Sequence, residues 1–139
     1  MTKHHGRCHC GQVDYDVDIP DQENHILCHC SACKYMSGGE YTVNHYIPSK
    51  NLHINKGDLS TYTYLGDSGQ PVHCHFCTNC ASPIYNHPES AGQNYVLRTS
   101  SVDHAFDWPV VAEVEAAHRA KWQPDVAPSD HIYEAEPPA

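Results

Sequence analysis

The fold of this chain is decided by three short cysteine-rich stretches: Arg7-Cys8-His9-Cys10-Gly11, Cys28-His29-Cys30-Ser31-Ala32-Cys33 and Cys77-Thr78-Asn79-Cys80. Cysteines two or three positions apart on a tight turn bring their sulfurs close enough to bind one tetrahedral zinc ion. The first and third stretches therefore predict a closed structural site made of Cys8, Cys10, Cys77 and Cys80. The second stretch predicts a site with an open position, typical of catalytic zinc, made of Cys28, Cys30 and Cys33.

Three other interpretations of the cysteines stay open. The eight cysteines could form four disulfides, but the N-terminus has no apolar stretch typical of a secretory signal. We therefore expect a cytoplasmic protein, in a reducing compartment where disulfides are rare. Both zinc ions could instead be structural, with His29 or another histidine completing the second site. Cys74, which precedes the third stretch, is predicted to be a small buried hydrophobic residue.

The composition supports a small domain that is cross-linked by metal. Leu, Ile, Val and Phe together account for only 23 of the 139 residues, whereas there are 8 cysteines and 13 histidines. So few large apolar residues build a thin core, and small domains of this kind are commonly stabilised by bound metal or disulfides. The length favours a single domain.

The charge excludes two classes of partner. The chain carries 8 Lys and Arg against 17 Asp and Glu, a net charge of −9 with histidine neutral. Nucleic acids and anionic membrane surfaces are bound by basic faces, so we expect neither as a partner. No apolar run approaches the length of about 18 residues that a membrane span needs.

The hydrophobic pattern predicts a mainly β protein of short strands. Residues 114–122 are ambiguous, because their composition favours a helix. From residue 123 onward, four prolines and four acids predict a loosely held tail, so we expect one zinc-binding domain over 1–122 and a Pro- and acid-rich C-terminal tail over 123–139. The predicted strands cover residues 13–19, 25–27, 40–47, 52–54, 59–65, 72–76, 83–86, 95–99 and 110–114.

Histidines near the cysteines are candidates for moving protons. His29 lies inside the second stretch, and His73 and His75 lie on one face of the strand that leads to Cys77, with Cys74 on the other face. An imidazole near neutral pH can accept or donate a proton. The candidate catalytic residues are therefore His29, His73 and His75, among which the sequence does not choose.

The three stretches resemble the glutathione-dependent formaldehyde-activating enzyme family, a domain shared with centromere protein V. The resemblance runs from Arg7 to Trp122 and includes Ser82-Pro83-Ile84-Tyr85 after the third stretch and Arg119-Ala120-Lys121-Trp122 at its end. It implies a β-tent fold of short antiparallel sheets stapled by two zinc sites. It also implies the same division of the cysteines, with structural zinc on the four-cysteine set and catalytic zinc on the three-cysteine set.

Two positions depart from the family pattern. Ala81 stands where relatives usually have Gly after the last zinc ligand, at a turn that often needs a positive φ. Cys74 stands where many relatives have Arg, so a cation is absent that could bind an anionic substrate. Both departures bear on the use of glutathione more than on the fold.

The resemblance implies a zinc-dependent carbon–sulfur lyase that handles a thiol adduct of a small carbonyl compound, with glutathione as a candidate thiol. Three thiolates make zinc a weak Lewis acid, which suits the activation of a substrate thiol more than the polarisation of water. One alternative is a zinc-dependent lyase or dehydratase acting on a metabolite that is not a thiol. Another is a non-enzymatic zinc-binding module for protein interaction.

Overall fold

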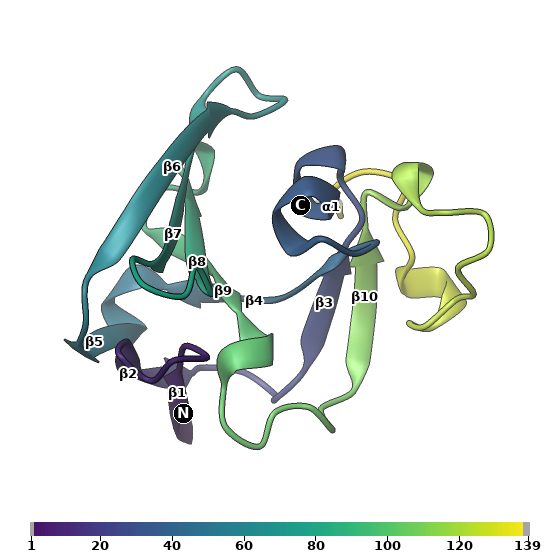
Figure 1. The fold of residues 1–139 in the computed structure, drawn as a ribbon. Coiled ribbons are helices and arrows are strands. Elements are labelled where there is room, and N and C mark those ends of the chain that lie inside the picture. Colours follow the sequence, from purple (N-terminus) through teal and green to yellow (C-terminus); the bar gives the residue numbers. More distant parts are fainter. Residues whose placement is uncertain (1, 138–139) are drawn as a thin grey trace. The chain divides into compact units, whose positions relative to one another are not determined.

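The computed structural model describes residues 2–137, which form two compact units (Figure 1). The first unit contains residues 2–22 and 45–106, and the second contains residues 23–44 and 107–137. Each unit is therefore built from two separate stretches of the chain. Each also carries one complete cysteine cluster of the predicted pair.

The first unit contains a small antiparallel sheet in the order β1-β2-β5. Its strands are β1 (Thr2–Arg7), β2 (Asp14–Ile19) and β5 (Leu52–Lys56). Along β2 the apolar side chains are fully buried and alternate with partly exposed aspartates. This two-residue period supplies one apolar face, which is how a chain with few aliphatic residues builds a core.

A second antiparallel sheet of the first unit has the order β9-β8-β7-β6. Its strands are β6 (Leu59–Leu65), β7 (Pro71–Cys77), β8 (Pro83–Pro88) and β9 (Asn94–Arg98). The end of β4 (Thr42–Pro48) lies beside β9. The first unit also contains three short 3-10 helices, over Ser49–Asn51, Glu89–Ala91 and Thr99–Ser101.

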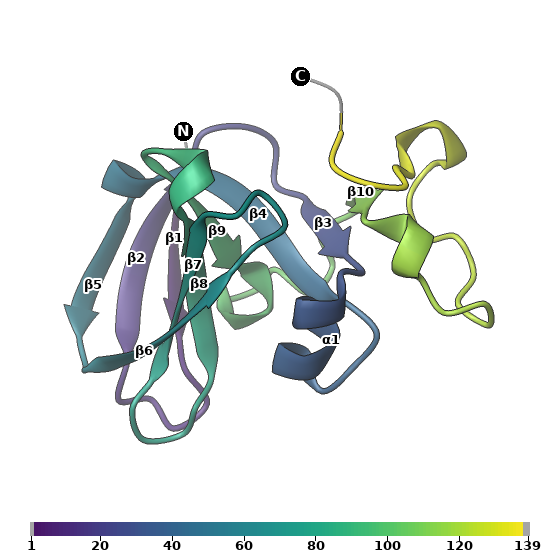
Figure 2. The ribbon, with the colours of Figure 1, turned by 90° about the horizontal axis from the view of Figure 1, so that it is seen from above.

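The second unit consists of β3 (His25–Cys28), helix α1 (Ser31–Ser37), the start of β4, and β10 (Val110–Val114). Strand β3 pairs with β4 in antiparallel and with β10 in parallel orientation, and α1 follows directly from β3 (Figures 1 and 2). The parallel β3–β10 pair is an exception to the antiparallel pairing that the family resemblance implies. Two 3-10 helices follow, over Ala116–His118 and Ser129–His131.

All nine strands predicted from the sequence are present, and the protein is mainly β as expected. Strand β1 was not predicted, because Thr2–Arg7 is polar and its pattern carries no apolar period. Helix α1 was not predicted either, because the spacing of its cysteines indicates a metal-binding turn. Its end is marked in the sequence by Gly38, which adopts the left-handed conformation (φ 68°) that commonly closes a helix.

The predicted C-terminal tail is hydrogen-bonded to the second unit over its described part, up to residue 137. Tyr133 donates its backbone N–H to the carbonyl of Glu113 at 2.8 Å, and Glu115 donates to the carbonyl of Ala135 at 3.0 Å. The side chain of Ala127 is only 5% exposed. These residues are therefore held more firmly than their composition indicated; residues 138–139 of the tail lie outside the described part.

Within residues 2–137, none of the helices combines the length and the apolar character that crossing a bilayer demands.

Candidate metal centres

The four-cysteine cluster joins two turns of the first unit. Cys8 and Cys10 lie on the turn between β1 and β2, Cys77 is the last residue of β7, and Cys80 lies on the turn that leads to β8. All four sulfurs lie within 4.8 Å of one another. Turns that are about 70 residues apart in sequence are thereby brought together, as the sequence predicted.

The sulfur spacing of this cluster fits a tetrahedral zinc ion. Zinc–sulfur bonds of about 2.3 Å place two sulfurs of a tetrahedral site about 3.8 Å apart. The Sγ atoms of Cys8 and Cys10 are 3.5 Å apart, and those of Cys10 and Cys77 are 3.8 Å apart. All eight cysteines of the chain are free. The four sulfurs can thus bind one tetrahedral ion together, and they leave no coordination position for a further ligand.

Backbone and side-chain donors around the cluster favour thiolates. The N–H of Val13 donates to the Sγ of Cys8 at 3.2 Å, and the N–H of Asn79 donates to the Sγ of Cys77 at 3.4 Å. The Ser82 hydroxyl lies 3.1 Å from the Sγ of Cys80. Together with backbone hydrogen bonds from Cys10 and Ser82, this hydroxyl lowers the pKa of the Cys80 thiol to about 5. Burial and the sulfurs of Cys80 and Cys8 raise the pKa of the Cys77 thiol to about 11. Metal binds thiolates, so the donors prepare Cys80 for an ion, whereas the thiolate of Cys77 depends on the ion itself.

The turn after the last ligand has the backbone shape expected from the family pattern. Ala81 adopts φ 65°, in the left-handed region that favours glycine. Its N–H donates to the carbonyl of Cys77 at 2.9 Å, which closes the turn around the ligand pair. The turn therefore keeps its geometry without glycine, at the expense of backbone strain.

The three-cysteine cluster lies where β3 passes into α1. Cys28 is the last residue of β3, Cys30 is the N-cap of α1, and Cys33 lies in its first turn. Their sulfurs lie within 4.8 Å of one another. The Sγ of Cys30 accepts a hydrogen bond from the N–H of Cys33 at 3.3 Å, so the helix cap itself fixes one of the three donors.

The negative charges of the three thiolates in this cluster favour a bound cation. The neighbouring sulfurs of Cys30 and Cys33, together with burial, raise the pKa of the Cys28 thiol. Three thiolates this close repel one another, and a bound divalent cation removes that repulsion. In residues 2–137, no histidine or carboxylate places a ligand atom within 4.8 Å of all three sulfurs. The donor set therefore fits zinc with three protein ligands.

His29 does not complete the three-cysteine site. Its side chain is fully buried, and its Nε2 lies 2.8 Å from the Oε1 of Glu113, which is also fully buried. Its ring also meets Tyr41 edge-on, with centroids 5.6 Å apart. Glu113 was not predicted from the sequence as a residue of this site. Its signal is an acid inside the otherwise apolar stretch Val-Val-Ala-Glu-Val of β10, where a charge needs a buried partner.

His73 and His75 lie in the first unit, on one face of β7, and Cys74 is buried beneath the other face. The Nε2 of His73 is 2.7 Å from the Oε2 of Glu89 and its Nδ1 is 2.8 Å from the Thr63 hydroxyl.

The ring of His75 stacks on Tyr85, which stacks in turn on Tyr95, with 4.4 Å between successive centroids. Burial lowers the pKa of His75, and the nearby His73 and His87 lower it further.

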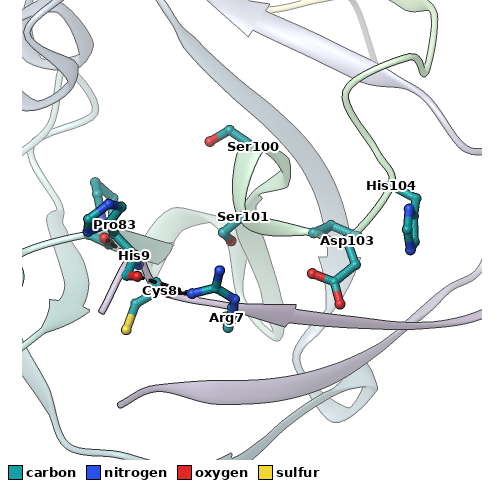
Figure 3. A pocket seen from close by; sticks show the side chains of 10 residues that line it. Arg7, Cys8, His9, Pro83, Ser100, Ser101, Asp103 and His104 are labelled. Carbon is teal, nitrogen blue, oxygen red and sulfur yellow. Dashed lines mark hydrogen bonds between the residues drawn. The ribbon is translucent and has the colours of Figure 1, made fainter. Parts of the chain in front are cut away.

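A polar pocket of about 470 Å³ lies beside the four-cysteine cluster (Figure 3). It is lined by Cys8 but by none of the three cysteines of the second cluster. The Arg7 guanidinium is held at its wall, where Nη1 donates to the carbonyls of Cys8 and His9 at 3.1 and 3.0 Å. Other polar side chains on the wall are Ser82, Ser101, Asp103 and His104. Sequence reasoning did not single out this group of residues as a pocket.

Comparisons with known proteins identify the family that the chain matches. The family model described as glutathione-dependent formaldehyde-activating enzyme matches residues 3–135. A curated protein of Halomonas elongata, named as a candidate glutathione-dependent formaldehyde-activating enzyme, is 31% identical over 83 residues, which are 58% of this chain. The match spans about half (53%) of that relative's length.

Among solved structures, the crystal structure of a Rhodobacter sphaeroides protein aligns with a TM-score of 0.60 at 20% identity. The alignment covers 72% of this chain and 88% of that chain, and it supports the fold alone.

Proposed function

Because the chain belongs to the glutathione-dependent formaldehyde-activating enzyme family, we propose that it is a zinc-dependent carbon–sulfur lyase. Its substrate in this proposal is the adduct of a small thiol, such as glutathione, with a small carbonyl compound. The observation that carries the proposal is the contrast between the two clusters, one with four sulfurs and one with three. A three-sulfur site has room for one ligand from solution.

The proposal assigns the metal to named side chains. Cys8, Cys10, Cys77 and Cys80 would hold structural zinc, whereas Cys28, Cys30 and Cys33 would hold catalytic zinc. A zinc ion with three thiolate ligands would supply a position for a soft fourth ligand and would favour the thiolate form of an incoming thiol. The protein's own contribution is to hold the three sulfurs at the end of β3 and the start of α1.

Proton transfer is proposed for a histidine, and the three candidates differ in their surroundings. His29 is fully buried against Glu113, which suits a fixed orientation more than exchange of protons with solvent. His73 is held by Glu89 and Thr63 through both ring nitrogens. Burial, together with the nearby His73 and His87, lowers the pKa of His75. All three histidines therefore stay candidates for the proton transfer.

We also propose a cytoplasmic location, which the eight free cysteines support. Thiols that bind metal persist in a reducing compartment and are oxidised outside it.

Cobalt substitution tests the proposed function, because each sulfur added to Co²⁺ strengthens the thiolate-to-metal absorption. Glutathione or a simple thiol is expected to change the spectrum of the cobalt-loaded wild type. The matched variant Cys30→Ser has lost one of the three sulfurs and should not give this change. A spectrum that no thiol perturbs, but that an oxygen-ligand metabolite does, would favour a lyase or dehydratase acting on a non-thiol substrate.

A further inference from the structure

Glu113 is a fully buried carboxylate on a strand that packs beside the three-cysteine cluster. It lies on β10, which pairs in parallel with β3, so that Glu113 is opposite Leu27 and Val114 is opposite Cys28. A carboxylate without access to water has to be satisfied by protein donors, since burial otherwise disfavours its charge. The groups that donate hydrogen bonds to the Glu113 carboxylate therefore show which segments this carboxylate holds in place.

The two oxygens of Glu113 face different parts of the second unit. Oε1 lies 2.8 Å from the Nε2 of His29 and 3.5 Å from the Nη1 of Arg119. Oε2 accepts hydrogen bonds from the backbone N–H groups of Val126 and Ala127 at 2.8 and 3.0 Å. One carboxylate thus connects the cysteine-bearing turn to the C-terminal segment.

The His29 side of this connection leads directly to the sulfurs. His29 lies between Cys28 and Cys30, and its backbone N–H donates to the carbonyl of Val114 at 3.1 Å. The residue is therefore tied to β10 twice, once through its backbone and once through its ring. With the ring fixed in the interior, the backbone on either side of it has one orientation, and so have the Cβ atoms of both cysteines.

The other side holds the start of the C-terminal segment. Two backbone N–H groups of this segment donate to Oε2 of Glu113. A third link is an ion pair, in which the Nη1 of Arg119 lies 2.8 Å from the Oδ1 of Asp125. The carbonyl of Glu113 accepts from the N–H of Tyr133, which adds a backbone link from the same residue to the same segment. Residues 125–127 and 133 are thus organised around Glu113.

We propose that Glu113 is a positioning residue of the three-cysteine metal site, which orients Cys28 and Cys30 through His29 and couples the site to the C-terminal segment 125–127. The inference rests on the proposed function only in requiring that the three cysteines bind metal. Outer partners of metal ligands commonly change metal affinity about 10- to 100-fold.

Cobalt titration of the full chain under reducing conditions tests this inference without any substrate. Cys30→Ser supplies the spectrum of the four-cysteine site, and subtraction from the wild type gives the spectrum of the three-cysteine site. Glu113→Gln is expected to lower the cobalt affinity of the three-cysteine site about 10- to 100-fold and to change its visible spectrum at saturation. The four-cysteine site, in the other unit, should bind cobalt as in the wild type and reports that the first unit is folded.

Two further variants complete the experiment. Glu134→Gln removes an exposed carboxylate from the same unit and is the matched control, with both sites expected to behave as in the wild type. Arg119→Gln removes the cation whose Nη1 lies 3.5 Å from the Oε1 of Glu113, and it should weaken the three-cysteine site in the same direction but less. It provides the measurement if Glu113→Gln does not fold.

A changed spectrum at saturation distinguishes positioning from a purely structural role, because lower stability alone leaves the loaded site unaltered. Wild-type affinity and spectrum in Glu113→Gln would overturn the inference. So would loss of both sites in Glu113→Gln together with wild-type behaviour of Arg119→Gln. A wild-type chain that binds one metal only would overturn the proposed function as well, whereas thiol entry in the wild type with an unaltered Glu113→Gln would overturn this inference alone.

Discussion

Ala81 shows how a single residue bears the strain of a metal-binding turn. Its φ of 65° lies where an L-residue other than glycine is disfavoured by about 1–2 kcal/mol. We expect Ala81→Gly to raise the free energy of unfolding of the zinc-loaded protein by about 0.5–1 kcal/mol, because the relief of strain exceeds the added flexibility of the unfolded chain. Urea unfolding at fixed zinc concentration measures this change.

Gly38→Ala is the matched reverse substitution, since it adds a Cβ atom at a similar positive φ. Gly38 has a φ of 68° at the end of α1, and an added Cβ would meet no atom within 4 Å. Gly38→Ala should therefore lose about 1 kcal/mol through backbone strain alone. A loss of stability in Ala81→Gly would contradict the strain argument.

At the scale of elements, a charged group links the strands of the small sheet. The Nε2 of His5 on β1 lies 2.6 Å from Asp14 on β2, and its Nδ1 lies 2.7 Å from Asp103. Asp103 and Asp14 raise the pKa of His5 above its usual value of 6.5. The stabilisation is therefore complete below pH of about 6.5 and is lost as the pH rises through the raised pKa of the folded state.

Replacement of this histidine tests the link. The difference in free energy of unfolding between the wild type and His5→Gln should be larger at pH 6 than at pH 9, as measured by urea unfolding at both values. His53→Gln, on an exposed side chain of β5, is the control for the loss of a histidine from the same sheet. A His5→Gln difference that grows with pH would contradict the sign of the pKa shift.

At the scale of the whole molecule, each unit has its own cluster, so the two metals should act separately. We expect about two zinc ions per chain by elemental analysis of protein purified under reducing conditions. Cys77→Ser opens the closed site and should impair folding. Cys30→Ser should keep the fold and lower occupancy of the three-cysteine site. Circular dichroism and thermal melts separate the two variants, and equal unfolding of both would mean that both metals are structural.

The charge of the whole chain leads to a different prediction. With 8 Lys and Arg against 17 Asp and Glu, the protein should not bind duplex DNA at physiological salt, since phosphate neutralisation needs a cluster of cations. A gel-shift titration with a random duplex measures this. Micromolar binding that weakens with added salt would contradict the prediction.

The sequence by itself determined nine of the ten described strands and the grouping of seven cysteines into two clusters. Alternation along Asp14–Ile19 fixes which side chains are buried, since the two faces of a strand repeat every second residue. The C-x-C and C-x-x-C spacings bring neighbouring sulfurs together by local turn geometry alone. Such features are readable because they depend on residues that are near one another in the chain.

Only the tertiary structure decided what lies around the clusters. Glu113 meets His29 across 84 positions of sequence, and the N–H groups of Val126 and Ala127 reach it from the predicted tail. The prolines and acids of residues 123–139 predicted a loose tail. Composition carries no information about the hydrogen bonds that the backbone N–H groups of this segment form. A buried carboxylate is hydrogen-bonded by whichever donors lie close to it in space. The pairing of β10 with β3 brings Glu113 close to His29.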